Sequence, residues 1–186
     1  MRLRPKVVHR NYVVNQSSRK GAQIKGIVVH STEGNNVPNS AADLIGLGTW
    51  FDNPRAQCSS HTGVDGDGQS ARYVKDYFKA WTCAHYNPVT LNVEIIGKAA
   101  EGRSVWFSRT PQLDEVARWI AHWSIKHKIP IRKGAVSSIT RSFTKTGVVR
   151  HSELGAAGGS HHDPGAGFPL RYVMVRARLY KKLRLR

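Results

Sequence analysis

The sequence predicts a single α/β domain of 186 residues. Short runs of β-branched residues, such as IKGIVVHST (24–32) and VTLNVEIIG (89–97), are typical of buried strands. A segment with helical periodicity, TPQLDEVARWIAHWSIKHKIP (110–130), follows them along the chain. No internal repeat and no linker divides the chain, and its length suits one hydrophobic core.

The first third of the chain predicts an arm, a strand and a helix. Residues 1–23 are basic and polar, and we expect a basic N-terminal arm that precedes the main body of the domain, residues 24–169. The run 24–32 predicts a buried strand. A helix is expected from about Ser40, a suitable N-cap, to Phe51, shortly before a proline.

The middle of the chain predicts a hairpin and a second buried strand. In SSHTGVDGDGQSARYV (59–74), the sequence DGDG is typical of a turn, and His61 lies on the first strand. The strand predicted over 89–97 is apolar enough to be central, yet it contains Glu94. A carboxylate in such a strand suggests a general base. The alternative is a solvent-facing residue, because alternate strand residues share a face.

The last part of the chain predicts a long helix, a short strand and a basic tail. Thr110 can cap the helix and Pro111 suits its first position. Its apolar face is formed at helical spacing by Leu113, Val116, Ala117, Ile120, Ala121 and Ser124. GVVRH (147–151) predicts a strand that ends on His151, and residues 170–186 predict a basic helix that belongs to the same domain.

The charge is the least ordinary feature of the composition. Lys and Arg number 29 against 12 Asp and Glu, which leaves a net charge of +17. Such an excess implies a polyanionic partner, and nucleic acid, anionic membrane and anionic wall polymers all qualify. The N-terminus lacks the apolar region of a secretory signal, so we expect synthesis in the cytoplasm. Cys58 and Cys83 can pair, although two free thiols are the simpler interpretation.

Three polar residues stand where a metal site would be built. His30 and His151 each follow a short strand, and Asp163 lies in the glycine-rich segment HHDPGAGFP (161–169) beside a predicted turn. Two imidazoles and one carboxylate are a usual catalytic zinc set that leaves a fourth position for water. The same three ligands would also suit non-haem iron.

The order of the motifs resembles the zinc-dependent N-acetylmuramoyl-L-alanine amidases, the amidase-2 family related to peptidoglycan recognition proteins and to phage endolysins. The motifs are GIVVHST, SSHTGVDGDG, AWTCAHYNPVTLNVEIIG, VVRHSEL and HHDPGAGFP, and they cover about Ile24 to Pro169. The resemblance implies a central mixed β-sheet flanked by helices. It also implies zinc-dependent cleavage of the amide between N-acetylmuramic acid and L-alanine in peptidoglycan.

The resemblance assigns roles to individual residues. The zinc ligands fall on His30, His151 and Asp163, in agreement with the strand-end argument, and the catalytic glutamate falls on Glu94. Many members have a lysine where this chain has His161, which we expect to stabilise the oxyanion.

The resemblance also suggests residues that contact the substrate. Those expected in this role are His61, His85, Asn87 and Thr32. Some relatives have a tyrosine where this chain has Ser60, so a mechanism that depends on that tyrosine is not expected here.

We expect one zinc ion per chain and a monomeric enzyme. It would act on bacterial peptidoglycan as a phage or prophage endolysin, and the basic surface would attract anionic wall polymers. The tail could instead bind membrane lipid as an amphipathic helix, or be a solvated helix packed through Leu179 and Leu183. The rival functions are non-catalytic peptidoglycan binding, recycling of wall fragments in the cytoplasm and nucleic-acid binding, and no nucleic-acid signature supports the last of these.

Overall fold

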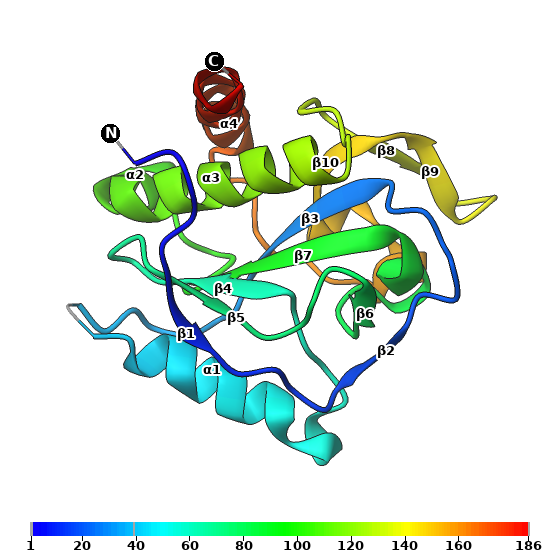
Figure 1. Cartoon of the computed structure of the whole chain (residues 1–186), viewed down its shortest axis with the longest axis horizontal. Helices are drawn as coiled ribbons and strands as arrows, with labels where there is room; N and C mark the ends of the chain where they lie inside the picture. The colour runs from blue at the N-terminus through cyan, green and yellow to red at the C-terminus, as the bar shows by residue number, and fades with distance from the viewer. Residues whose placement is uncertain (1, 39, 186) are drawn as a thin grey trace.

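A computed structural model describes residues 2–38 and 40–185. It confirms the mixed α/β class, with a central six-stranded sheet and helices on both of its faces (Figure 1). The helices are α1 (Ala42–Asp52), α2 (Arg103–Ser108), α3 (Thr110–Lys126) and α4 (Leu170–Arg184). The strands are β1 (Val7–Arg10), β2 (Gln16–Ser18), β3 (Gly26–Ser31), β4 (Thr62–Val64), β5 (Ser70–Arg72), β6 (Phe78–Ala80), β7 (Thr90–Ile95), β8 (Ala135–Ser137), β9 (Ser142–Lys145) and β10 (Gly147–Arg150).

The central sheet has the order β1-β5-β4-β7-β3-β10. Strands β4, β7, β3 and β10 are parallel to one another, whereas β5 is antiparallel to β4 and β1 runs parallel to β5. Two small ribbons, β2-β6 and β8-β9, lie outside this sheet. Because these strands are parallel, the C-terminal ends of β3, β7 and β10 lie together at one end of the sheet. The chain leaves each strand there for a loop.

The two faces of the sheet have different roles. One face packs against α3 and α4 through apolar residues from alternate strand positions, including Ile27 on β3 and Val93 on β7. The other face is covered by α1 only over the β5 half of the sheet, where Leu44 and Phe51 pack near Tyr73 (Figure 1). Over β3 and β10, Tyr86 and Phe143 cover Val28 and Val149 on that face. Polar residues occupy it at the C-terminal ends of β3 and β7, where His30 and Glu94 lie side by side.

The basic arm is part of the fold rather than an appendage. Residues 7–10 form the edge strand β1 of the central sheet. The carboxylate of Glu115, on α3, accepts hydrogen bonds from the Lys6 backbone N–H at 2.5 Å and the Ser70 hydroxyl at 2.9 Å, and it pairs with Arg2 at 2.8 Å. The sequence suggested a surface arm because the short run VVHR lacks the length of the central strands.

The N-terminal caps of two helices differ from those expected from the sequence. Helix α1 begins at Ala42, and Ser40 accepts a hydrogen bond from the Ala42 N–H without being the cap residue. Helix α3 begins at Thr110 itself, so the residue before it is Arg109. The reason is the short helix α2, which ends just before α3 and was not expected from the sequence. The expected apolar face of α3 is confirmed, since all six of its residues are buried.

Helix α4 packs against α3 through its buried residues, which include Val173, Ala177 and Tyr180. Leu179 is 40% exposed, so it does not pack in the way that one of the two alternatives for the tail required. No helix among the described residues has the length and apolarity to cross a bilayer. Cys58 and Cys83 are free thiols, as the simpler interpretation held.

Candidate metal and active site

The site begins with two neighbours in the sheet. His30 on β3 pairs in register with Glu94 on β7, so both side chains leave the sheet on the face that α3 does not cover. The His30 Nδ1 atom lies 3.9 Å from a carboxylate oxygen of Glu94. The Glu94 side chain is 13% exposed and lines a groove, so it is not the solvent-facing strand residue of the alternative interpretation.

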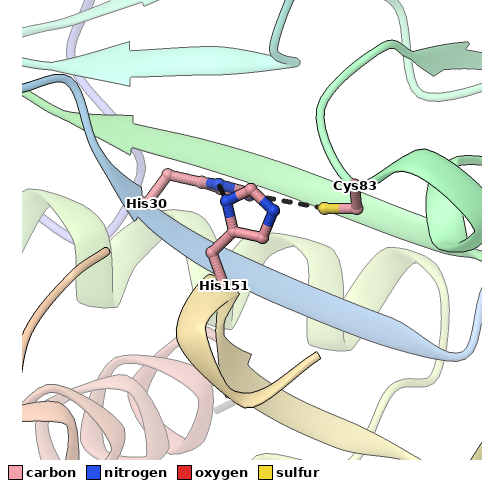
Figure 2. A group of neighbouring side chains, drawn as sticks. All are labelled: His30, Cys83 and His151. Atoms are coloured by element: carbon pink, nitrogen blue, oxygen red, sulfur yellow. Dashed lines mark hydrogen bonds between the residues drawn. The ribbon is translucent and has the colours of Figure 1, made fainter. Parts of the chain in front are cut away.

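Strand β10 brings the second histidine to the same place. It pairs with β3, and His151 follows it directly, in the 3₁₀ turn His151–Glu153. The Nδ1 atoms of His30 and His151 lie 2.9 Å apart, with their rings nearly edge to face (Figure 2).

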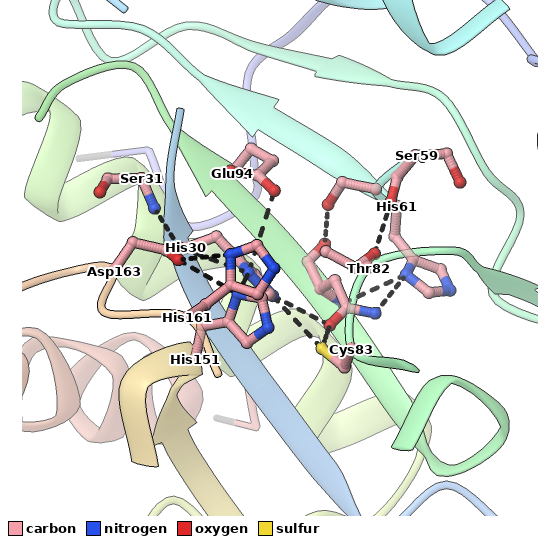
Figure 3. Close-up of polar contacts among 12 residues, drawn as sticks. His30, Ser31, Ser59, His61, Thr82, Cys83, Glu94, His151, His161 and Asp163 are labelled. Atoms are coloured by element: carbon pink, nitrogen blue, oxygen red, sulfur yellow. Dashed lines mark hydrogen bonds and ion pairs between the residues drawn. The ribbon is translucent and has the colours of Figure 1, made fainter. Parts of the chain in front are cut away.

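Asp163 lies in the glycine-rich loop that follows His151. Its backbone carbonyl accepts a hydrogen bond from the Ser152 N–H, and one carboxylate oxygen accepts another from the Ser31 N–H at 3.0 Å. The carboxylate lies 3.6 Å from His30 Nδ1 and 3.2 Å from His151 Nδ1 (Figure 3). Gly159 lets the loop turn, because its φ of +104° suits glycine and an added Cβ would lie 2.9 Å from the His161 ring.

Hydrogen bonds on the far side of each ring fix the tautomers. His30 Nε2 lies 3.1 Å from the Asn92 side-chain oxygen, and His151 Nε2 lies 2.9 Å from the Gly158 carbonyl. Each oxygen can only accept, so each Nε2 carries the proton. Both Nδ1 atoms are therefore left with a lone pair directed at the same point as the Asp163 carboxylate, an arrangement usual around metal-binding histidines.

The three donors fit a metal ion. Nitrogen and oxygen ligands at about 2.0–2.1 Å from a tetrahedral zinc ion would lie about 3.3 Å from one another. The distances here, 2.9, 3.6 and 3.2 Å, scatter around that value. The residues that the sequence selected as ligands therefore form a donor set of suitable chemistry and size.

Cys83 offers a second donor near His30. His30, Cys83 and His151 together could also hold an ion, as could His151, His161 and Asp163. The sulfur, however, lies 3.6 Å from the protonated Nε2 of His30, on the far side of the ring from Nδ1 (Figure 2). Burial raises the pKa of this thiol well above its ordinary value, and the thiol donates a hydrogen bond to Asn92. Cys83 therefore supports the position of Asn92 and His30, and the Nδ1-side set is the better ligand set.

Burial shifts the proton affinities of the site. It lowers the pKa of His30 to about 4, with a further contribution from His151, so this ring is neutral at pH 7. Burial acts to raise the pKa of Asp163, but the adjacent rings of His151 and His30 outweigh it and hold that pKa well below its usual range. Burial, and then the negative charge of Asp163, raise the pKa of Glu94 well above its ordinary value. Glu94 is therefore the carboxyl group best suited to accept a proton.

A groove of about 530 Å³ contains these residues. One of its walls is apolar and includes Leu47, Trp50 and Phe51 of α1. Its acidic residues are Glu33, Glu94 and Asp163, and no Lys or Arg belongs to the part of its lining that the structure describes. A neutral and acidic groove in a chain of net charge +17 means that the positive charge lies elsewhere on the surface.

The structure places only some of the expected substrate contacts in this groove. Thr32, Asn87 and His161 line it, and the His161 ring stacks on His151 with centroids 4.2 Å apart. His85 is exposed but does not line the groove, and its ring lies against Tyr86.

His61 is fully buried, which excludes it from contact with a substrate. Its Nδ1 accepts a hydrogen bond from the Asn92 N–H at 3.1 Å, and its Nε2 lies 2.8 Å from an Arg19 nitrogen. The sequence could not show this burial, because Arg19 lies far upstream. Ser60, where some relatives have a tyrosine, is also buried and donates to the Asn92 carbonyl.

Several residues of the groove were not expected from the sequence. They are Glu33, Trp50, Cys58, Trp81, Thr82 and His162. Trp50 had a detectable signal: it is a large aromatic residue on a predicted helix, and it remains 54% exposed beside the site. The others lie in loops whose approach to the groove depends on long-range contacts.

Comparison with known proteins agrees with this geometry. Residues 20–166 match the Amidase_2 family, described as N-acetylmuramoyl-L-alanine amidase. The N-acetylmuramoyl-L-alanine amidase A of Achromobacter lyticus is 32% identical over 80 residues, which are 42% of this chain and only 41% of that relative.

Solved structures share the fold at low identity. The Staphylococcus aureus hydrolase AmiA, solved with its ligand, has a TM-score of 0.70 at 17% identity and covers 98% of this chain and 86% of its own. The endolysin amidase LysCS of Clostridium intestinale has a TM-score of 0.63 at 17% identity, covering 94% and 97% of the two chains. The match over residues 20–166, with the site described above inside it, shows that this chain belongs to the N-acetylmuramoyl-L-alanine amidase family.

Proposed function

We propose that the protein is a zinc-dependent amidase that hydrolyses the bond between N-acetylmuramic acid and L-alanine in peptidoglycan. The observation that carries this proposal is the convergence of two unprotonated Nδ1 atoms and the Asp163 carboxylate beside Glu94, in a groove open to a substrate. A zinc ion held by His30, His151 and Asp163 would polarise the scissile carbonyl and lower the pKa of water.

The residues of the chain then have separable tasks. Glu94 accepts a proton from the attacking water at a carboxylate oxygen and passes it to the leaving nitrogen of L-alanine. His161, whose side chain is about half exposed above Asp163, donates a ring N–H to the developing oxyanion. Ser31 holds Asp163, while Asn92 and the Gly158 carbonyl hold the two histidine rings.

The decisive experiment combines product analysis with a matched pair of variants. Mass spectrometry of digested peptidoglycan should show new lactyl carboxyl groups and free L-alanine amino termini. Glu94→Gln should bind zinc normally and lose about 10²–10⁴-fold in rate, the usual contribution of a general base. Glu33→Gln, which changes another carboxylate of the same groove, should remain active. Cut glycan strands, or wild-type turnover by Glu94→Gln, would refute the proposal.

We further propose that the enzyme acts on the bacterial wall as an endolysin after synthesis in the cytoplasm of the host. The fold similarity to the LysCS endolysin and the strongly basic surface support this role. Lysis of cells on exposure to added enzyme is the expected result. Activity restricted to small soluble wall fragments would instead indicate a recycling enzyme.

A further inference from the structure

A second pocket, of about 310 Å³, shares no lining residue with the catalytic groove. It lies between the N-terminal segment, the end of β5 and helix α3. Its charged residues are Arg4, Arg10, Arg72, Lys126 and Asp76, so four cations face one carboxylate and leave a net charge of +3. His122, which also lines the pocket, adds no charge at pH 7, because burial lowers its pKa to about 4.

The single carboxylate of the pocket is already fully engaged. Asp76 lies 2.6 Å from Arg72, 2.8 Å from Lys126 and 2.9 Å from His127. Arg4 and Arg10 are exposed, and neither has an ion pair within the described residues. The positive charge at the mouth of the pocket is therefore not neutralised by the protein.

The interior of the pocket contains donors without acceptors. Trp119 is 3% exposed and lines the pocket, and its Nε1 is a buried donor with no partner among the described residues. The Arg72 guanidinium lies over the Trp119 ring at 5.0 Å. Both hydrogen bonds that Arg72 donates within the described residues come from Nη2, so Nε and Nη1 remain available. A buried donor normally has a partner, and here an anion with several oxygens would supply it.

A neighbouring pocket adjoins the pocket of Arg72 and Trp119. It shares Asp76 and Lys126 with that pocket and adds Lys20 and Tyr77, and we call the two pockets together the trough. Lys75 lies over the rings of Tyr12 and Tyr77, one from each pocket, at 4.8 and 5.9 Å. A linear ligand with repeated negative charges could follow this surface from one pocket to the other.

We propose that this trough binds a phosphate-bearing anionic polymer of the bacterial wall, with one phosphate group held in the pocket of Arg72 and Trp119. The choice of a wall polymer over nucleic acid rests on the proposed function, because the substrate of that function lies in the same wall. The trough holds the enzyme to its insoluble target, while the groove, which lacks cations in its described lining, takes the peptide and sugar at the scissile bond.

Binding is tested with purified poly(ribitol phosphate) and two double variants of equal net charge. Arg4→Glu with Arg10→Glu reverses two exposed cations of the trough, and Arg103→Glu with Arg171→Glu reverses two exposed cations elsewhere. Each pair lowers the net charge by four, from +17 to +13. The trough variant should bind the polymer about tenfold or more weakly, because it loses local phosphate contacts, whereas the control should change by about twofold or less. An equal loss in both variants would overturn the proposal.

Two further measurements distinguish a built phosphate site from attraction to net charge alone. Inorganic phosphate should shift one indole N–H resonance, and that resonance should be absent from Trp119→Phe; no such shift would overturn the pocket. Tighter binding to single-stranded DNA than to the polymer, at equal charge of the two ligands and equal salt, would also overturn the proposal.

The trough variant should hydrolyse a soluble muropeptide at the wild-type rate and intact walls more slowly. If the wild type does not hydrolyse the muropeptide, the proposed function is refuted. The polymer-binding measurements still test the trough in that case.

Discussion

Arg19 offers the sharpest test of how the N-terminal segment supports the site. Its side chain is buried, at 7% exposure, and four of its five N–H groups donate to backbone carbonyls. These carbonyls belong to Asp76, Asn87, Pro88 and Thr90, and the remaining N–H group packs against the ring of His61, whose Nε2 lies 2.8 Å away. His61 in turn accepts from Asn92, whose side chain accepts from His30.

Replacing Arg19 with Met removes every one of these donors and keeps much of the side-chain volume. A hydrogen bond to a charged group contributes about 1.5–3 kcal/mol, but four such contributions do not add, because water can enter the emptied space. We therefore expect a loss of about 3–5 kcal/mol in the free energy of unfolding, because buried carbonyls are left without donors and each unsatisfied group costs about 1–3 kcal/mol. Zinc affinity should fall by about tenfold, since changes to the groups that orient metal ligands cost this much.

Urea denaturation measures the first effect and a competitive zinc titration the second. Lys20→Met, an exposed neighbour, should change stability by about 0.5 kcal/mol or less. If Arg19→Met loses less than about 1 kcal/mol with an unchanged m-value, the buried network does not hold the structure together.

Three other outcomes are expected. Gly159→Ala should lower the hydrolysis rate, because the added Cβ would lie 2.9 Å from the His161 ring. The control Gly155→Ala has no atom within 4 Å of the added Cβ, so it should lower only the stability, through its positive φ. Equal losses of activity in the two variants would contradict this reasoning. Burial acts to raise the pKa of Asp76, but His127, Arg72 and Lys126 hold it below the unfolded value of about 3.9. Its contribution to stability is therefore complete above that pH and is lost as the pH falls, so Asp76→Asn should flatten the decline in urea midpoint between pH 5 and pH 3. Chelation should abolish hydrolysis and lower the melting temperature, both restored by zinc, and activity that survives full metal removal would contradict the proposed cofactor.

The sequence predicted the parts of the site that depend on strands. His30 and Glu94 could be found because each interrupts or ends an apolar run, and parallel pairing of β3 with β7 then places them side by side. Asp163 was found from turn chemistry and from the resemblance. The candidate ligands and the candidate general base were thus accessible from local pattern, and the structure brings these side chains together.

The remaining features depend on contacts between distant segments. His61 was expected at the substrate because its motif lies near the site, but Arg19 buries it from 42 residues away. Strand β1 pairs with β5 across more than sixty positions, which a run of four residues cannot reveal. The trough has the same origin, since it joins the N-terminal segment to Trp119 on α3. Such sites require the tertiary structure, because no periodicity links their members.

The acidic character of the groove has a consequence for how a cation reaches it. A divalent ion approaching a chain of net charge +17 is repelled at long range, and salt weakens this repulsion beyond about 10 Å at 0.1 M. Within the groove, the described lining contains the carboxyl groups of Glu33, Glu94 and Asp163 and no Lys or Arg. Loading should therefore be limited by the approach to the molecule and not by capture at the site. Moderate salt would accelerate metal uptake, although it weakens the attraction of the same molecule to its anionic surroundings.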